Sequence, residues 1–328
     1  MDQLHEPQAA GDAQNNNNSN NNGGQVLAAE GVEAMEARAP VPTIHHRPQE
    51  PYEGFRMRLR GEERQWARAI KAAIEAEPDL QSLPSDFDYA QLACVDLDDV
   101  EEAVARTRRM QYFQQELEIE DSLESGLRFI REAVRLFPGF FLGMSFTYAR
   151  GGGHYTMAVN TNALNNGRLS NADGAARKTL MTALYHCLHA LNPDFESTVQ
   201  GIVILVECDH FDWNQHGNLA ALRHIQSEVG VAVIKHYPTE WHQVRLFNTG
   251  MVFNMIMSLM RPFLPLALRG RVRLGCSSAL GNLENIFVHP NLEASNERFL
   301  MFFEDCLHRR YSKVASFSLD YVPPDEVF

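Results

Sequence analysis

The chain lacks the cysteine pattern of a secreted, disulfide-bonded protein. It has only five cysteines in 328 residues, an odd number, scattered and mostly set in apolar runs: Cys94, Cys187, Cys208, Cys276 and Cys306. Free buried thiols in a reducing compartment explain this pattern better than disulfide bonds. No basic segment followed by an apolar stretch opens the chain, and no uncharged apolar run reaches membrane-spanning length. We therefore expect a cytoplasmic protein.

The motifs of common enzyme classes are also missing. There is no Gly-x-Ser-x-Gly element, and no cysteine lies in an evident nucleophile setting. The run Gly151-Gly152-Gly153 lacks the lysine and hydroxyl of a phosphate loop, so we interpret it as a hairpin turn. His186 and His189 share one flank of a predicted helix, where polar positions of an amphipathic helix explain them more simply than metal ligation. We expect no enzymatic activity and no metal site.

One acidic cluster keeps a catalytic interpretation open. Residues 207–212 (Glu-Cys-Asp-His-Phe-Asp) follow the most apolar predicted strand, where open α/β sheets usually bind ligands. Carboxylates beside a histidine suit acid–base catalysis, but their spacing matches no metal motif, and acidic residues also cap loops for structural reasons. A hydrolase that uses residues 207–216 would lose activity on Asp209→Asn.

Negative charge dominates the chain, and one local cluster of basic residues stands against it. The net charge of −13 repels nucleic acid and anionic lipid as a whole, so any attraction to membranes must be local. Residues 249–264 form a helix-length segment that is apolar on nearly every face and rich in methionine, a residue that suits adaptable surfaces. Basic side chains lie before, in and after it: Arg245, Arg261, Arg269, Arg271 and Arg273. Phosphate binding by these arginines and pairing with neighbouring acids are equally open.

Periodicity predicts an α/β protein. Residues 1–50 include an asparagine run and are expected to be disordered. Residues 51–137 show helical patterns, with acidic residues from Asp96 at one helix start. Strand and helix then alternate: a glycine hairpin over 140–159, a helix over 175–191, an apolar strand over 201–206, a helix over 219–235, two alternating strands near 244–246 and 272–274, and a helix over 297–311.

Several of these residues together resemble the CRAL-TRIO lipid-binding family. The resemblance is carried by Tyr237-Pro238 before a strand, Leu246-Phe247-Asn248, the helix ending in Met260-Arg261-Pro262-Phe263-Leu264, and Arg271-Val272-Arg273-Leu274-Gly275. The strand before Phe211-Asp212-Trp213 is most similar to the alpha-tocopherol transfer and retinaldehyde-binding branch.

The resemblance implies a fold, a ligand class and a set of site residues. It implies a helical N-terminal subdomain at 51–137, then a CRAL-TRIO-like domain at 138–312 whose mixed or parallel sheet and flanking helices enclose a hydrophobic cavity, and a C-terminal tail at 313–328. It implies a monomeric carrier of a tocopherol, retinoid or phosphoinositide-like lipid, with no cofactor besides that lipid, no nucleic-acid partner and transient contact with anionic membranes. The cavity and gate residues would be Phe146, Tyr155, Phe253, Ile256, Met257, Met260 and Phe263. The membrane or phosphoinositide contacts would be Arg245, Arg261, Arg269, Arg271 and Arg273.

A second interpretation keeps the fold without the transfer function. The family's paired glycines are replaced at residues 289–295, and its asparagine turn lacks the usual proline at 248–250. A regulatory or protein-interaction module with a filled cavity would explain both departures.

Overall fold

The computed structural model describes residues 43–45, 59, 61–96, 99–149, 152–164, 174–208, 237–250, 254, 258, 261, 270–276 and 292–321, all within the unit Pro40–Phe328. The helices are α1 (Gly61–Ala76), α2 (Asp86–Val95), α3 (Val100–Glu116), α4 (Leu123–Leu136), the short η1 (Thr161–Ala163), α6 (Ala175–Leu191), α7 (Phe195–Gln200) and α14 (Leu292–Ser316). The strands are β1 (Thr43–His45), β2 (Phe141–Ala149), β3 (Gly152–Asn160), β4 (Ile202–Glu207), β5 (Trp241–Phe247) and β6 (Val272–Cys276). The asparagine run and the helix predicted over 219–235 lie outside the described residues.

Side-chain caps set the starts of the N-terminal helices. Ser85 caps α2 by accepting the amide of Asp88, and Asp99 caps α3 by accepting the amide of Glu102. Asp96, predicted to lie at a helix start, instead follows the last residue of α2, and its carboxylate binds Arg106 at 2.7 Å. The prediction of acidic residues at this helix start is confirmed three residues later by Asp99, whose side chain reaches the free amides of α3, and by Glu101 and Glu102 in the first turn.

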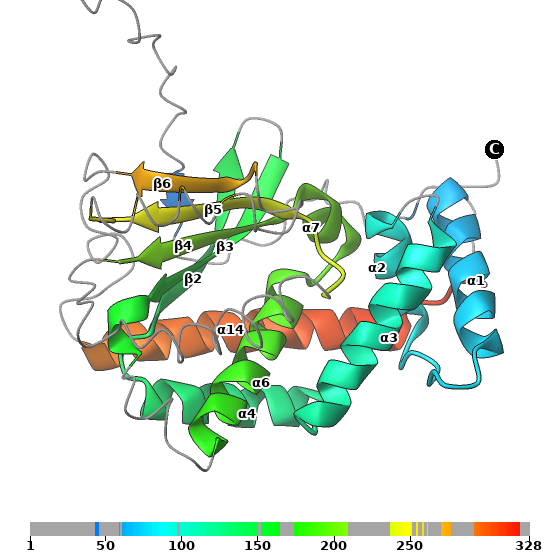
Figure 1. Ribbon diagram of the computed structural model, residues 1–328, viewed down its shortest axis with the longest axis horizontal. Helices are drawn as coiled ribbons and strands as arrows, with labels where there is room; N and C mark the ends of the chain where they lie inside the picture. Colours follow the sequence, from blue (N-terminus) through cyan, green and yellow to red (C-terminus); the bar gives the residue numbers. More distant parts are fainter. Residues whose placement is uncertain are drawn as a thin grey trace, which may run out of the picture. The chain divides into compact units, whose positions relative to one another are not determined.

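The described strands form one mixed sheet of six in the order β1-β2-β3-β4-β5-β6 (Figure 1). The predicted glycine hairpin is confirmed as the antiparallel pair β2–β3, and β4, β5 and β6 continue the sheet in parallel. Crossovers between parallel strands need a dozen or more residues, and α6 with α7 supplies the first of them. The α/β class expected from the sequence is therefore confirmed.

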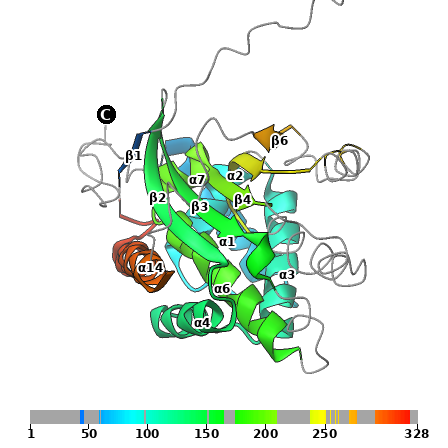
Figure 2. The same ribbon diagram turned by 90° about the vertical axis from the view of Figure 1, so that its left-hand side faces the viewer.

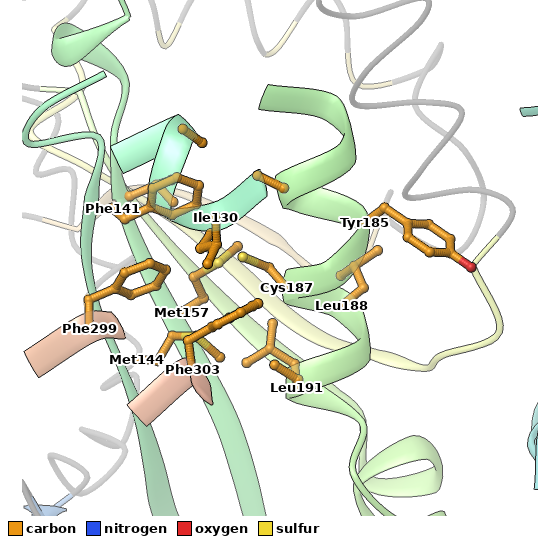
Figure 3. Close-up of a cluster of buried hydrophobic side chains, with 14 of the residues drawn as sticks. Ile130, Phe141, Met144, Met157, Tyr185, Cys187, Leu188, Leu191, Phe299 and Phe303 are labelled. Carbon is orange, nitrogen blue, oxygen red and sulfur yellow. The ribbon is translucent and has the colours of Figure 1, made fainter. Parts of the chain in front are cut away.

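Helices α6 and α14 pack against one face of this sheet, and α4 packs against both of these helices (Figures 1 and 2). Met144 and Met157, paired across β2 and β3, point into the helices and meet Phe299 and Phe303 of α14 (Figure 3). The rings of Phe141 and Phe299 stack with their centroids 4.8 Å apart. This interior is close-packed, so the sheet has one face committed to structure. We call it the packed face.

A second hydrophobic cluster lies among α1, α2 and α3. Its centre includes Ile70, Phe87 and Leu92, and residues from the end of the chain, including Leu319, pack into it. Helix α14 is longer than the predicted 297–311 and reaches from the packed face toward this cluster. Helix α4, which precedes residue 138, belongs to the sheet-side core. The boundaries drawn at residues 50, 137 and 312 stay predictions.

Candidate lipid-binding surface

Strand alternation and register define the face of the sheet opposite the packed one. Met157 and Ile204 are paired across β3 and β4 and lie in the packed core, so their neighbours Ala158 and Leu205 point to the other side. We call this other side the second face. On it lie, strand by strand, Ser145, His154, Thr156, Ala158, Val203, Leu205, Glu207, Gln243, Arg245, Phe247 and Arg273.

One row across the second face changes from apolar to cationic. Ala158 pairs with Leu205, Leu205 with Arg245, and Arg245 with Arg273, so the four side chains follow one another across β3, β4, β5 and β6. Ala158 is fully buried, Leu205 and Arg245 are half-buried, and Arg273 is exposed. The row thus has an apolar end and a cationic end, and a lipid with an acidic headgroup has the matching polarity.

The predicted basic cluster is brought together only in part. Arg245 and Arg273 are register partners on adjacent strands, and the Nε of Arg245 donates to Gln243 at 2.7 Å. Arg271 lies just before β6, where it pairs with Glu240 at 2.6 Å and donates to the carbonyl of Trp241. Arg261 is exposed, and Arg269 lies outside the described residues. The strand arginines are therefore the pair that the sheet itself positions.

Two of the predicted cavity residues lie on the packed face. The rings of Phe146 and Tyr155 meet edge to face with centroids 4.8 Å apart, and both belong to the core formed with α14. Burial raises the pKa of the Tyr155 phenol. Their role in a lipid cavity stays a prediction, and they are separated from the second face by the thickness of the sheet. The predicted gate residues Phe253, Ile256, Met257, Met260 and Phe263 lie outside the described residues.

The strand-end cluster has the features of a structural site where it is described. Glu207 is buried, and its carboxylate accepts a hydrogen bond from Asn248 at 2.9 Å, which joins the ends of β4 and β5. Burial raises the pKa of the Cys208 thiol to about 12, so this cysteine is a poor nucleophile at neutral pH. Asp209, His210 and the rest of that cluster lie outside the described residues.

The two histidines of α6 are placed differently from the prediction. His186 has no exposed surface and His189 very little, so neither occupies the solvent flank of an amphipathic helix. That prediction was wrong because α6 is covered on this side by α4 and α14, and both contacts are remote in sequence. No group of three or more His, Cys, Asp or Glu side chains suited to a metal occurs within the described part of the chain.

Three arginines of α4 lie near the protein surface, and two of them pair with neighbouring acids. Arg131 pairs with Glu304 of α14 at 3.2 Å, and Arg135 pairs with Glu132 at 2.6 Å, both exposed to solvent. Arg128 lies over the ring of Phe129 at 4.9 Å. Such surface pairs contribute little to stability, so this helix face serves mainly as a charged, solvated surface.

Residues 160–296 match the CRAL/TRIO domain family, a segment that contains α6, α7, β4, β5 and β6. The match supports the resemblance carried by the sequence motifs and, with it, a general association with lipid binding or transfer rather than with catalysis. No curated protein matches the chain. Over the described residues, no helix is both long and apolar enough to cross a membrane.

Proposed function

We propose that this protein is a cytoplasmic, monomeric carrier that binds one small hydrophobic lipid against the second face of its sheet and exchanges it at anionic membranes. The ligand class is a tocopherol, a retinoid or a phosphoinositide-like lipid. The observation that carries the proposal is the row Ala158–Leu205–Arg245–Arg273, which lies largely within the segment similar to the CRAL/TRIO domain.

In this proposal the two ends of the row contribute different kinds of binding energy. Apolar ligand surface removed from water at the Ala158–Leu205 end contributes roughly 25 cal/mol per Å². At the other end, each arginine near an anionic membrane adds about 1 kcal/mol, and salt weakens this attraction. Arg271 makes a smaller contribution in this scheme, because a phosphate there competes with Glu240.

Lipid extraction tests the binding function. The purified chain is incubated with vesicles of phosphatidylcholine containing phosphatidylinositol, tocopherol and retinal, re-isolated, and its ligand is identified by mass spectrometry. We expect one lipid class at close to one molecule per chain. Recovery of no lipid from any vesicle composition would refute the carrier function.

Paired variants locate the site. Leu205→Glu places a charge in the apolar half of the row and should abolish lipid recovery. Val199→Glu makes the same change at an exposed position of α7 and should leave recovery intact. If both variants lose lipid recovery equally, or if neither variant loses it, the second face is not the binding site. Circular dichroism of each variant shows whether the fold is retained.

A second pair tests membrane docking. The double variant Arg245→Glu/Arg273→Glu should weaken flotation with anionic vesicles by roughly thirtyfold, since two arginines supply about 2 kcal/mol. Arg128→Glu/Arg135→Glu changes the net charge equally on α4 and should have a much smaller effect. If both doubles weaken flotation alike, overall charge rather than the arginine pair governs docking.

The filled-cavity interpretation has one observation in its favour. Ala158 has no exposed surface, and Ser145 beside it on the second face is also buried. A protein-interaction module of this kind would yield no lipid in the extraction experiment, and Leu205→Glu would impair its folding rather than its ligand content.

A further inference from the structure

A cavity of about 280 Å³ lies among the helices, away from the second face of the sheet. Helices α2, α3 and α6, the loop after α3 and the segment Tyr237–Pro238 contribute its walls. Exposed side chains stand at its rim, among them Gln81, Gln115 and Glu118, whereas Tyr185, His189 and Tyr237 are buried at its base. It is therefore a pocket that opens to solvent and ends in polar aromatic groups.

Three rings form the base of this cavity. The centroids of Tyr185 and His189 are 4.5 Å apart, those of His189 and Tyr237 are 5.1 Å apart, and those of Tyr185 and Tyr237 are 6.0 Å apart. All three pairs are edge to face, and Tyr185 points away from the core beneath the sheet (Figure 3). Ring faces and phenol oxygens together attract cations.

Among the described residues, no lysine or arginine lies at salt-bridge distance from Asp121, one of the carboxylates in the wall. Asp88 pairs with Arg310 at 3.0 Å. Asp121 accepts a hydrogen bond from the hydroxyl of Tyr311 at 2.6 Å, and its other oxygen lies 3.8 Å from Nε2 of His189, too far for a hydrogen bond. Burial lowers the pKa of His189 well below its ordinary value, so this imidazole is neutral at pH 7. Burial opposes ionisation of Asp121, but the pKa of this carboxyl lies below its ordinary value, since the hydrogen bond from Tyr311 and the positive charge of Arg310 favour the ionised form.

Two groups at the base have hydrogen-bonding capacity to spare. Within the described part of the chain, neither ring nitrogen of His189 and not the hydroxyl of Tyr237 has a hydrogen-bond partner, although these residues are only 3% and 2% exposed. Buried polar groups are nearly always paired with protein, water or ligand. A guest that donates hydrogen bonds satisfies the hydroxyl of Tyr237 and occupies the gap between His189 and Asp121.

Arg310 argues against an anionic guest. One of its terminal nitrogens donates to Gln91 and to the carbonyl of Asn192, each at 2.9 Å, and the other donates to Asp88. The guanidinium is thus occupied by protein acceptors and offers little to a phosphate or carboxylate.

We propose that this cavity binds a small primary amine in its ammonium form, with its N–H groups donating to the carboxylate of Asp121 and the hydroxyl oxygen of Tyr237. The rings of Tyr185 and His189 flank the charged nitrogen. A water occupies about 30 Å³ of liquid, so the cavity holds a molecule of up to roughly nine non-hydrogen atoms. The site shares no residue with the second face, so it is independent of the lipid-carrier proposal.

Calorimetric titration of the full chain with n-propylammonium chloride tests the site. We expect saturable binding, weaker binding of tetramethylammonium because it lacks N–H donors, and no binding of acetate or inorganic phosphate. Absence of heat and of NMR shifts up to about 10 mM propylammonium would overturn the proposal and leave water as the guest. Tighter binding of phosphate than of the amine would overturn it as well.

Two conservative variants assign the contacts. Asp121→Asn should weaken propylammonium binding at least tenfold, with Asp305→Asn, a substitution outside the cavity on α14, as the matched control.

Tyr237→Phe removes one oxygen atom while Asp121 remains, and should weaken propylammonium binding several-fold. Its control is Tyr112→Phe, at an exposed position of α3. Because Asp121→Asn also removes the charge that strengthens the hydrogen bond from Tyr311, Tyr237→Phe decides the matter if the asparagine variant does not fold. Unchanged binding in Tyr237→Phe would contradict the proposed contact. Leu205→Glu should leave amine binding intact, which separates this site from the lipid surface.

Discussion

His186 should make the protein sensitive to mild acid. This residue lies in the middle of α6 with no exposed surface, and neither ring nitrogen has a hydrogen-bond partner among the described residues. Its ring lies close to Gly126, where an added Cβ would be 3.1 Å from Nδ1. Burial lowers the pKa of His186 from its ordinary 6.5 to about 4, because the charged form loses its hydration. Replacing it with leucine, a side chain of similar size that cannot ionise, tests this account.

The sign and size of the effect follow from proton linkage. Below pH 6.5 the imidazole of His186 binds a proton in the unfolded chain, whereas in the folded chain it stays neutral until the pH approaches 4. Acid therefore favours unfolding. The part of the unfolding free energy that depends on a neutral His186 is fully present above pH 6.5 and is lost progressively as the pH falls toward 4. The whole difference is roughly 3 kcal/mol, of which about 2 kcal/mol is lost at pH 5.

Urea unfolding at pH 7.5 and pH 5.0 measures this difference. The native chain should lose more unfolding free energy between the two pH values than His186→Leu does, by about 2 kcal/mol. Groups such as His189 and the carboxylates titrate in both proteins, so the difference of differences isolates His186. His308→Leu, at an exposed position of α14, controls for the loss of a histidine as such. Equal acid sensitivity in the native chain and His186→Leu would refute the reasoning.

Two further predictions concern stability. Gly201 has a φ of 81°, and an added Cβ would lie 2.8 Å from the backbone nitrogen of His242, so Gly201→Ala should lower the unfolding free energy by about 2 kcal/mol or more. The control Gly61→Ala places its Cβ where no atom lies within 4 Å and should change the unfolding free energy by less than about 1 kcal/mol. Similar urea midpoints for the two variants would contradict this prediction. Arg310→Met should lower the unfolding free energy by about 3–5 kcal/mol because it leaves the carboxylate of Asp88 buried without its cation. Adding Asp88→Asn should recover part of that loss. A double variant that is no more stable in urea than Arg310→Met would show that the ion pair is not the cause.

Much of the fold was predictable because its signals are local. Helix α6 has the bounds expected from its sequence, and the change from helical to two-residue periodicity near residue 140 marks the start of β2. The alternation around Val244 and Val272 also identified β5 and β6 as strands with one apolar side. Each of these depends on neighbours within a few residues, where backbone periodicity governs which side chains share a face.

The helical cavity was not predictable, because its parts meet only through tertiary contacts. Asp121 follows a helix end, Tyr237 precedes a strand, and His189 looked like a surface residue until α4 and α14 covered α6. One signal was present in the sequence. Arg310 continues the apolar stripe of α14 formed by Phe299, Phe303 and Leu307, and a charge on such a stripe indicates a buried partner.

The register of β5 links this polar interior to the proposed lipid surface. Trp241 and Val244 both contact the packed core although they are three residues apart, because the pairing with β4 skips His242. Without this bulge, strict alternation would turn Arg245 toward the packed face. Contacts on either side of the bulge hold it in place. The rings of His242 and His154 stack with their centroids 3.8 Å apart. The hydroxyl of Thr239 donates to the side-chain oxygen of Asn192, and the backbone carbonyl of Asn192 accepts a hydrogen bond from Arg310. The buried network around Arg310 therefore anchors the strand that places Arg245 on the second face.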